Sequence, residues 1–401
     1  MIFAFYILAA ILIYFSYRSY RGGIEYLEYF RGELVKPPCG YMPFATVIAP
    51  CKGLDEGLSE NLTALFEQDY PRYEVIFVVD NESDAAVDTI KSLPHRREAK
   101  LIVAPKATES SQKVENLREA VLRASPESKV LVFVDSDARP SKNWLRHLVA
   151  PLENEKIGAA TGYRWFISKR PGFASGLRSV WNASIASSLG PNVKSNFCWG
   201  GSTAIRREVF ERLDIRERWR SVVSDDFTVT RTLNEAGLSI YFVPQALTAT
   251  IENCSFRELL EFTTRQMKIT RVYAPRLWLV SFFGSGLFNI VFAWSLMIIL
   301  SGSQNNTAGW IAAATLVLVT VFSVGKSRLR LSAVKLGLPQ YKNDLDRQLW
   351  AQYTLWTAAP AIFLINCVLA LFSQRIRWRG VTYEMISATQ TKIRNIDRTM
   401  V

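Results

Sequence analysis

Histidine is almost absent from this 401-residue chain, where it occurs only at His95 and His147. Two histidines supply a His-based zinc site or a Ser-His-Asp triad poorly. Cysteine is also sparse, with five scattered residues, an odd number without metal-type spacing. This cysteine pattern predicts a reduced compartment and no disulfide framework. The net charge is +12, but no recognisable nucleic-acid motif concentrates it, so we expect no nucleic-acid partner.

Charge is missing from four long apolar runs. The first run, 1–17, contains no charged residue, and three later runs lie at 279–301, 309–325 and 351–373. Each later run approaches the ~20 residues with which a helix crosses a bilayer. The stretch between the first and second runs has ordinary charge density. We therefore expect an integral membrane protein with an N-terminal anchor, a soluble domain and C-terminal membrane helices.

The soluble domain is expected to face the cytosol. The first apolar run lacks a basic region before it and a small-x-small cleavage site after it, which favours an uncleaved anchor over the alternative of a signal peptide. Basic residues follow this run, at Arg18 and Arg21, and the positive-inside rule places them in the cytosol. If all three later runs span the bilayer, the basic C-terminal tail lies outside, against the same rule. Run 351–373, interrupted by Pro360, is the candidate for a re-entrant or interfacial segment.

Apolar strands alternate with helical patterns in the soluble domain. This alternation predicts a parallel sheet covered on both faces, with ligands bound beyond the carboxyl ends of its strands. Two of the strands end in an aspartate, Asp80 and Asp135, where core packing gives no reason for a carboxylate. The expected strands are 45–50, 73–80, 101–104 and 130–135, and the expected helices are 58–67, 84–93 and 114–124.

The pattern Asp135-Ser-Asp137 follows the apolar strand Val-Leu-Val-Phe-Val. Two carboxylates at this spacing can converge on one hard cation, and a Mg²⁺ or Mn²⁺ ion held there neutralises charge on a leaving diphosphate. A turn or a helix cap is the alternative for either aspartate. Asp80 is a candidate hydrogen-bond acceptor for a base or ribose, with helix capping again as the alternative. The strand-end position favours a ligand site at both places.

Adjacent carboxylates, Asp225 and Asp226, begin a helical pattern at Ser224. Acidic residues stabilise a helix N-terminus, so capping is one interpretation. The other is a general base that accepts a proton from an acceptor hydroxyl.

Paired glycines beside a tryptophan, Trp199-Gly200-Gly201, are a candidate sugar or acceptor pocket. Glycines allow the backbone to approach a ligand, and the indole can stack on a sugar face. A tight turn before a strand is the alternative.

Residues 256–274 mix apolar and basic residues at helical spacing, which predicts an amphipathic helix in the membrane interface. Arg265 and Lys268 on this helix are candidates to face phosphates, with snorkelling as the alternative.

The motifs occur in an order that resembles glycosyltransferase family 2, in its ceramide glucosyltransferase-like branch. The similarity runs from about Ala45 through the C-terminal membrane segments, and its motifs are Pro50-Cys-Lys-Gly53, Asp80, Asp135-Ser-Asp137, Ser224-Asp-Asp-Phe227, Arg265-Gln-Met-Lys268-Ile269 and Trp378-Arg-Gly-Val-x-Tyr383. The chain departs from the branch at Lys268-Ile269, where Arg-Trp is expected, and at Thr161, where the ceramide enzymes tend to have histidine. The resemblance therefore implies a lipid acceptor more firmly than ceramide itself.

The resemblance implies an α/β fold: a GT-A-type nucleotide-sugar-binding domain with a mixed, mainly parallel sheet, plus membrane segments. It implies inverting transfer from a UDP-sugar, with UDP-glucose favoured, to a lipid hydroxyl. Asp80 would bind the nucleoside, Asp135 the ribose or metal, and Asp137 the metal. Asp226 would be the catalytic base, and Lys113, Arg265 and Lys268 would contact the donor. The expected parts are 1–17 anchor, 18–43 connector, 44–255 catalytic domain, 256–276 interfacial helix, 277–373 membrane helices and 374–401 basic tail.

Two other functions remain open from the sequence. A processive polysaccharide synthase shares the same motif set, but three C-terminal segments are few for a polymer channel. A non-catalytic membrane lipid-binding protein is the other alternative, and it has no need of aspartates at strand ends.

Overall fold

The chain forms two compact units in the computed structural model, which describes residues 2–37, 39–94, 98–301 and 307–396. His95 and the last five residues of the predicted tail lie outside the described residues. The helical unit comprises Met1–Arg31, Arg170–Ser187 and Asn253–Ser373. The sheet unit comprises Gly32–Lys169, Ser188–Glu252 and Gln374–Val401.

The sheet unit is built on a seven-stranded sheet in the order β3-β2-β1-β4-β7-β5-β8. Strand β7 runs antiparallel to both of its neighbours, and the other pairings are parallel. Every residue of the two strands β2 and β4 is buried, as expected for Val- and Ile-rich strands covered on both faces. The strands are β1 (Ala45–Pro50), β2 (Tyr73–Val79), β3 (Ala99–Val103), β4 (Val130–Val134), β5 (Ile157–Thr161), β7 (Ser202–Arg206) and β8 (Ser239–Phe242).

The predicted strands and helices of residues 45–135 are all present, within a few residues of their expected ends. Because β2, β1 and β4 are parallel neighbours, their carboxyl ends meet at one edge of the sheet. Asp80 directly follows β2, and Asp135 directly follows β4. Two strand spacings of ~4.8 Å separate them, so about 10 Å lies between the two strand ends.

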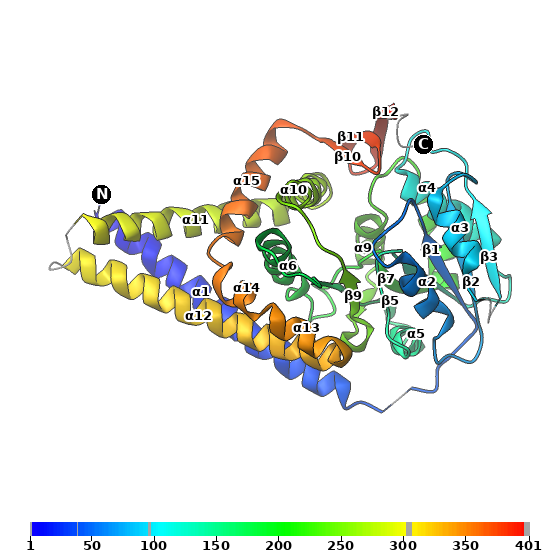
Figure 1. Cartoon of the computed structure of the whole chain (residues 1–401), viewed down its shortest axis with the longest axis horizontal. Helices are drawn as coiled ribbons and strands as arrows, with labels where there is room; N and C mark the ends of the chain where they lie inside the picture. The colour runs from blue at the N-terminus through cyan, green and yellow to red at the C-terminus, as the bar shows by residue number, and fades with distance from the viewer. Residues whose placement is uncertain (1, 38, 95–97, 302–306, 397–401) are drawn as a thin grey trace. The chain divides into compact units, whose positions relative to one another are not determined.

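Side-chain caps begin the helices that carry or flank the predicted site. Asp84, Ser111 and Ser224 each accept a hydrogen bond from a backbone N–H of the first turn. Figure 1 shows α2, α3 and α4 beside strands β1 to β3. The helices of this unit are α2 (Leu58–Phe66), α3 (Ala85–Ser92), α4 (Gln112–Arg123), α5 (Trp144–Val149), α7 (Arg207–Arg212), α8 (Ile215–Arg218) and α9 (Asp225–Glu235), with 3-10 turns at Ala150–Glu153 and Pro244–Ala246.

Two smaller sheets complete the sheet unit. Strands β6 (Arg164–Ile167) and β9 (Thr248–Ile251) pair in parallel. The residues predicted as a basic tail instead form an antiparallel sheet of three strands, β10 (Arg375–Trp378), β11 (Val381–Ser387) and β12 (Gln390–Ile396). Ile376 is buried between Arg375 and Arg377, and Tyr383 and Met385 are buried on either side of Glu384, so one face of this C-terminal sheet packs inward.

The helical unit contains three helices that are long and apolar enough to cross a bilayer, among the residues described. These are α1 (Ile2–Leu34), α11 (Pro275–Leu300) and α12 (Thr307–Gly337). Helix α1 continues far beyond the expected anchor 1–17, and its last turn belongs to the sheet unit. The remaining helices are α6 (Phe173–Ala186), α10 (Phe256–Tyr273), α13 (Lys342–Arg347), α14 (Leu349–Thr354) and α15 (Ala359–Phe372), with a 3-10 turn at Pro339–Tyr341.

The last apolar run, 351–373, does not form one spanning helix. It divides into α14 and α15, with Pro360 in the first turn of α15. Proline lacks a backbone N–H and fits only the first turn of a helix, which explains the break. The 14 residues of α15 extend about 21 Å, less than the ~30 Å hydrocarbon core. A re-entrant or interfacial position for this run stays a prediction.

Candidate active site

The two carboxylates of Asp135-Ser-Asp137 face two basic side chains. Lys113 Nζ, from the first turn of α4, lies 2.7 Å from Asp135 Oδ1. Arg164, at the start of β6, bridges the pair: its guanidinium nitrogens lie 3.3 Å from Asp135 Oδ2 and 3.0 Å from Asp137 Oδ2. The strand-end position thus gathers opposite charges from three separate parts of the chain. Arg164 was missed by sequence reasoning, because nothing local marks it as a partner of the aspartates.

Burial separates the proton affinities of these two aspartates. Burial raises the pKa of Asp137 to about 6; Arg164 opposes the shift, and the charges of Asp135 and Asp55 add to it. Burial acts on Asp135 in the same sense, but Lys113 and Arg164 hold its pKa below the usual range. Asp137 Oδ1 is buried and has no hydrogen-bond partner. A buried carboxylate oxygen without a partner is unfavourable, so this atom is suited to a further cation or ligand.

Asp225 completes the cluster, while Asp226 is hydrogen-bonded to its neighbours at the N-terminus of α9. Asp225 Oδ1 lies 3.4 Å from Lys113 Nζ. Burial raises the pKa of Asp225 to about 6; Lys113 lowers it, and Asp226 and Asp135 raise it further. Asp226 Oδ1 accepts hydrogen bonds from the Ser224 hydroxyl and, at 2.8 Å, from the Phe227 N–H. Only Oδ1 makes these two bonds, so the cap of α9 does not involve Oδ2.

The paired glycines are needed by the carboxylate cluster itself. A Cβ atom at Gly200 would lie 2.2 Å from Asp225 Oδ2 and 3.0 Å from Lys113 Nζ. A Cβ atom at Gly201 would lie 2.2 Å from the Trp199 ring and 2.7 Å from Asp135 Oδ2. Trp199 is buried, with the Arg164 guanidinium 4.7 Å above its ring. In this structure the glycines admit the protein's own carboxylates, and the indole supports Arg164.

Asp80 forms a second charged group at the same sheet edge. Its Oδ2 lies 2.7 Å from Lys52 Nζ and 3.0 Å from Lys106 Nζ. Burial raises the pKa of Asp80, but these two lysines outweigh it and hold the pKa below the usual range. Asp80 Oδ1 is buried without a hydrogen-bond partner. Lys106 was missed by sequence reasoning, whereas Lys52 lies in the Pro50-Cys-Lys-Gly53 motif that follows β1.

The remaining predicted donor contacts, Arg265 and Lys268, lie on α10 of the helical unit. They are three residues apart and so project toward the same side of the helix. Arg265 lies over the Phe262 ring, 5.7 Å from its centroid. Their contact with the donor stays a prediction.

The described residues contain no group of three or more His, Cys, Asp or Glu that could hold a metal ion. The pair Asp135 and Asp137 nevertheless fits Mg²⁺ or Mn²⁺, because hard oxygen ligands suit these ions. Mg²⁺ is commonly held by one or two carboxylates together with substrate phosphates. The unpartnered Oδ1 of Asp137 is consistent with this arrangement.

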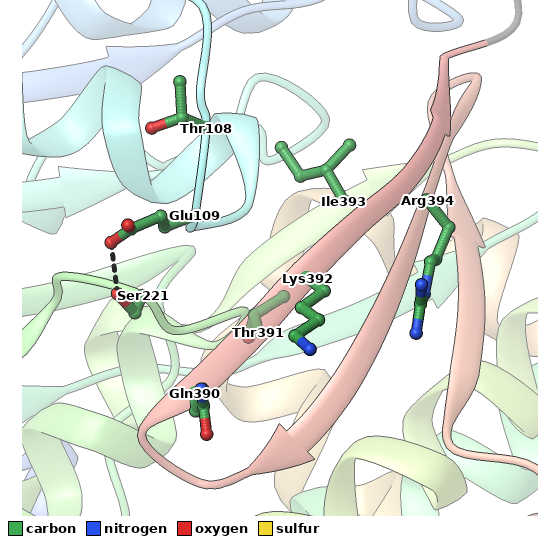
Figure 2. Close-up of a pocket in the computed structure, with 8 residues that line it drawn as sticks. All are labelled: Thr108, Glu109, Ser221, Gln390, Thr391, Lys392, Ile393 and Arg394. Atoms are coloured by element: carbon green, nitrogen blue, oxygen red, sulfur yellow. Dashed lines mark hydrogen bonds between the residues drawn. The ribbon is translucent and has the colours of Figure 1, made fainter.

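A polar cavity of about 340 Å³ lies elsewhere in the sheet unit, beside β12. Figure 2 shows Lys392 and Arg394 on one side of the strand, and Glu109 accepting a 2.8 Å hydrogen bond from the Ser221 hydroxyl. None of the predicted site residues lines this cavity. It is therefore distinct from the carboxylate cluster.

Comparison with known proteins places the chain among sugar transferases. The model of glycosyl transferase family 21 matches residues 4–391. Ceramide glucosyltransferase 3 of Caenorhabditis elegans is 21% identical over 389 residues, covering 94% of this chain and 80% of the relative. The ceramide glucosyltransferase of Komagataella phaffii is 29% identical over 75 residues, covering 19% of this chain and 15% of the relative. A mannosyltransferase from Pyrobaculum calidifontis, solved with GDP-Man and Mn²⁺, is 19% identical with a TM-score of 0.49, covering 91% of this chain and 99% of that one.

The family match, under family number 21, extends over both units. Together with the ceramide glucosyltransferase relatives, it confirms the ceramide glucosyltransferase-like resemblance. Together with the mixed, mainly parallel sheet and the apolar helices, it confirms the expected GT-A-type fold. The expected enzyme class, a glycosyltransferase, is confirmed as well. The chain belongs to glycosyl transferase family 21.

Proposed function

We propose that this glycosyltransferase moves a hexose from a UDP-sugar, with UDP-glucose favoured, to the hydroxyl group of a membrane lipid, with inversion. The observation that carries the proposal is the cluster of Asp135, Asp137, Asp225 and Lys113 at the carboxyl edge of the sheet. Ligands bind at this edge in sheets of this kind. The three long apolar helices and the relatives named as ceramide glucosyltransferases support a lipid acceptor.

The donor site would use both charged groups of the sheet edge. Asp80 would accept a hydrogen bond from the nucleoside through its unpartnered Oδ1, while Lys52 and Lys106 beside it add positive charge for phosphates. Asp135 and Asp137 would hold Mg²⁺ or Mn²⁺, which when bound neutralises charge on the leaving diphosphate. Lys113 keeps Asp135 ionised and in place for this role.

Transfer itself would need a base for the acceptor and positive charge for the leaving group. Asp226 would accept the proton of the lipid hydroxyl through the oxygen that its cap leaves available. Arg265 and Lys268 of α10 would stabilise the departing UDP, where charge develops in the transition state. Trp199, Gly200, Gly201 and Asp225 would border the sugar.

The direct test is incubation of membranes containing the full chain with a panel of UDP-sugars, followed by mass spectrometry of the lipids. We expect one hexose to be added to one lipid class, most efficiently from UDP-glucose. A ladder of polymer products would favour the polysaccharide synthase instead. No product, together with no binding of UDP and Mn²⁺ in calorimetry, would favour the non-catalytic alternative.

Metal-dependent UDP binding is expected to weaken as the pH falls below about 6, the value to which the pKa of Asp137 is raised. Metal binding needs the ionised carboxylate, so protons compete, and affinity falls by at most about tenfold per pH unit. The stability of the ligand-free protein should change in the opposite direction. Because the pKa of Asp137 is raised in the folded state, its contribution to the free energy of unfolding increases as the pH falls through about 6. Calorimetry with UDP and Mn²⁺ between pH 7.5 and 5.5 measures the effect. Asp137→Asn should bind weakly with little pH dependence; an unchanged pH profile in this variant would assign the titration to another group.

The catalytic sheet unit and the C-terminal sheet are expected on the cytosolic side together. If α1, α11 and α12 each span the bilayer, α11 carries the chain out of the cytosol and α12 brings it back. The chain then lies on the same side after α12 as after α1. The basic C-terminus would then lie in the cytosol, as the positive-inside rule favours, since the 14 residues of α15 are too few for a fourth crossing. Protease treatment of sealed cytosol-inside vesicles should spare a C-terminal tag and remove an N-terminal one. Cleavage of the C-terminal tag in such vesicles would contradict this topology.

A further inference from the structure

The turn between β10 and β11 places an arginine where the backbone disfavours one. Trp378 pairs with Val381, so Arg379 and Gly380 form a two-residue hairpin turn. Both have positive φ, 47° and 78°. Asn-Gly or Gly-Gly is the preferred sequence for such a turn, because a side chain crowds the left-handed conformation. A non-glycine residue held there points to a role for its side chain.

The C-terminal sheet is fixed against the loops that carry the donor-site residues. Tyr383, buried to 2% exposure, accepts a hydrogen bond of 3.1 Å from the backbone N–H of Gln112, the first residue of α4. Burial raises the pKa of the Tyr383 hydroxyl to about 12; the Gln112 N–H lowers it, and the nearby charge of Asp80 raises it. Lys113, the partner of Asp135, is the next residue of α4. The C-terminal sheet is therefore anchored next to Lys113, and Tyr383 lies near the charge of Asp80.

Arg379 reaches the aspartate pair through one intermediate carboxylate. Its guanidinium is paired with Asp55, and Asp55 Oδ2 accepts a 2.6 Å hydrogen bond from the hydroxyl of Ser136, the residue between Asp135 and Asp137. Burial lowers the pKa of Arg379, but Asp55 first, and then Asp137 and Glu252, raise it above its usual value. The guanidinium thus stands beside the acidic edge that would hold the donor.

Exposure distinguishes Arg379 from Lys113 and Arg164, the two cations that contact Asp135. The side chains of Lys113 and Arg164 are 16% and 13% exposed and are engaged by Asp135, Asp137 and Asp225. The side chain of Arg379 is 45% exposed, while that of its partner Asp55 is only 9% exposed. An incoming anion can therefore reach Arg379 without breaking the inner ion pairs. The planar guanidinium fork matches two phosphate oxygens.

We propose that Arg379 is a donor-binding residue that exchanges Asp55 for the diphosphate of the nucleotide sugar. Asp55 holds the guanidinium at the crevice until the donor arrives, and the C-terminal sheet then forms one wall of the donor site. This inference rests on the proposed function, because it takes the crevice to bind a nucleoside diphosphate.

The experiment compares binding of UDP and of uridine to the full-length protein in detergent by calorimetry, with Mn²⁺ present. Arg379→Ala should weaken UDP binding by about tenfold to a hundredfold, the order expected for a charge-assisted hydrogen bond. Uridine, which lacks phosphates, should bind Arg379→Ala as it binds the unaltered protein. Arg375→Ala is the matched control, because Arg375 lies on the same hairpin but pairs with Glu384, which Arg394 also contacts. Its UDP affinity should be unchanged.

Asp55→Asn separates direct binding from a positioning role. If Arg379 binds phosphate, this variant frees the guanidinium, so UDP affinity is kept or increased. Equal losses of UDP affinity in Asp55→Asn and Arg379→Ala would show that Arg379 acts only by holding Asp55, and would overturn the inference. Equal losses of UDP and uridine binding in Arg379→Ala would overturn it too. If the unaltered protein binds GDP and not UDP, the proposal of a UDP-sugar donor is wrong. The role of Arg379 is then tested with GDP and guanosine in the same way. Binding of neither nucleotide would contradict the proposed function and this inference together.

Discussion

Asp226→Asn is expected to reduce sugar transfer by roughly 10²–10⁴-fold, the usual contribution of a general base. Asparagine keeps an oxygen that can accept the bonds from Ser224 and from the Phe227 N–H, so the first turn of α9 should remain intact. The amide cannot accept the proton of the acceptor hydroxyl. Transfer is measured by lipid mass spectrometry at saturating donor, and UDP binding by calorimetry should be unchanged.

Asp225→Asn is the matched comparison, because it makes the same replacement of a carboxylate oxygen by an amide nitrogen at the neighbouring residue. Asp225 is buried beside Lys113 and Gly200, so its replacement should disturb the charge cluster and weaken donor binding. If Asp225→Asn abolishes transfer with donor binding intact, while Asp226→Asn remains active, the base is Asp225 instead. Its pKa of about 6 would suit that task.

Lys113→Met is expected to have the largest effect on stability. The substitution keeps the length of the side chain but removes the cation that lies 2.7 Å from Asp135 and 3.4 Å from Asp225. Breaking a buried ion pair by removing one partner typically costs about 3–5 kcal/mol, because the remaining charge is left unpaired. Arg164 still contacts Asp135, so the loss should fall at the lower end of this range. Thermal denaturation of the full-length protein at pH 7 should show a clearly lower midpoint and no donor binding.

The pH dependence of this defect gives a second measurement. Without Lys113, the pKa values of Asp135 and Asp225 rise, because its positive charge lowers both in the unaltered protein. Protonation then relieves the unpaired charge, so the difference in midpoint should shrink from pH 7 to pH 5. Lys106→Met is the control: Lys106 is 52% exposed and Asp80 keeps Lys52, so a small change is expected. A Lys113 defect that grows at low pH would contradict the ion-pair explanation.

The aspartates show how much of the candidate site can be predicted from the sequence. Asp80 and Asp135 were recognisable because each interrupts a run of apolar residues at its end, and parallel neighbouring strands bring such ends to one edge. Asp225 and Asp226 were recognisable as a pair, but their separate environments were not. Asp225 faces Lys113, whereas Asp226 accepts a hydrogen bond at the N-terminus of its own helix. Only the packing of α9 in the folded protein decides which aspartate has which environment.

The positions of two cations of the site, in contrast, could not be predicted from the sequence. Arg164 is one of many basic residues in the chain, and Arg379 lies in the Trp378-Arg-Gly motif without any sign of its partner. Neither lies near the aspartates in sequence. Strand β6 carries the first to the pair, and the C-terminal hairpin carries the second to Asp55. The residues expected as a basic tail form a sheet because the buried Ile376, Tyr383 and Met385 alternate with charged or polar residues and bury one face.

The sequence by itself determined the apolar segments, the α/β alternation, the aspartates at the strand ends and the family resemblance. These features depend on local hydrophobic periodicity and on residues a few positions apart, which a single strand or helix is enough to express. The tertiary structure alone decided which cation meets which carboxylate, why Gly200 and Gly201 are required, and that the C-terminus returns to the sheet unit. These contacts join residues 20 to more than 300 positions apart, and no local pattern records them because they arise only when distant elements pack together.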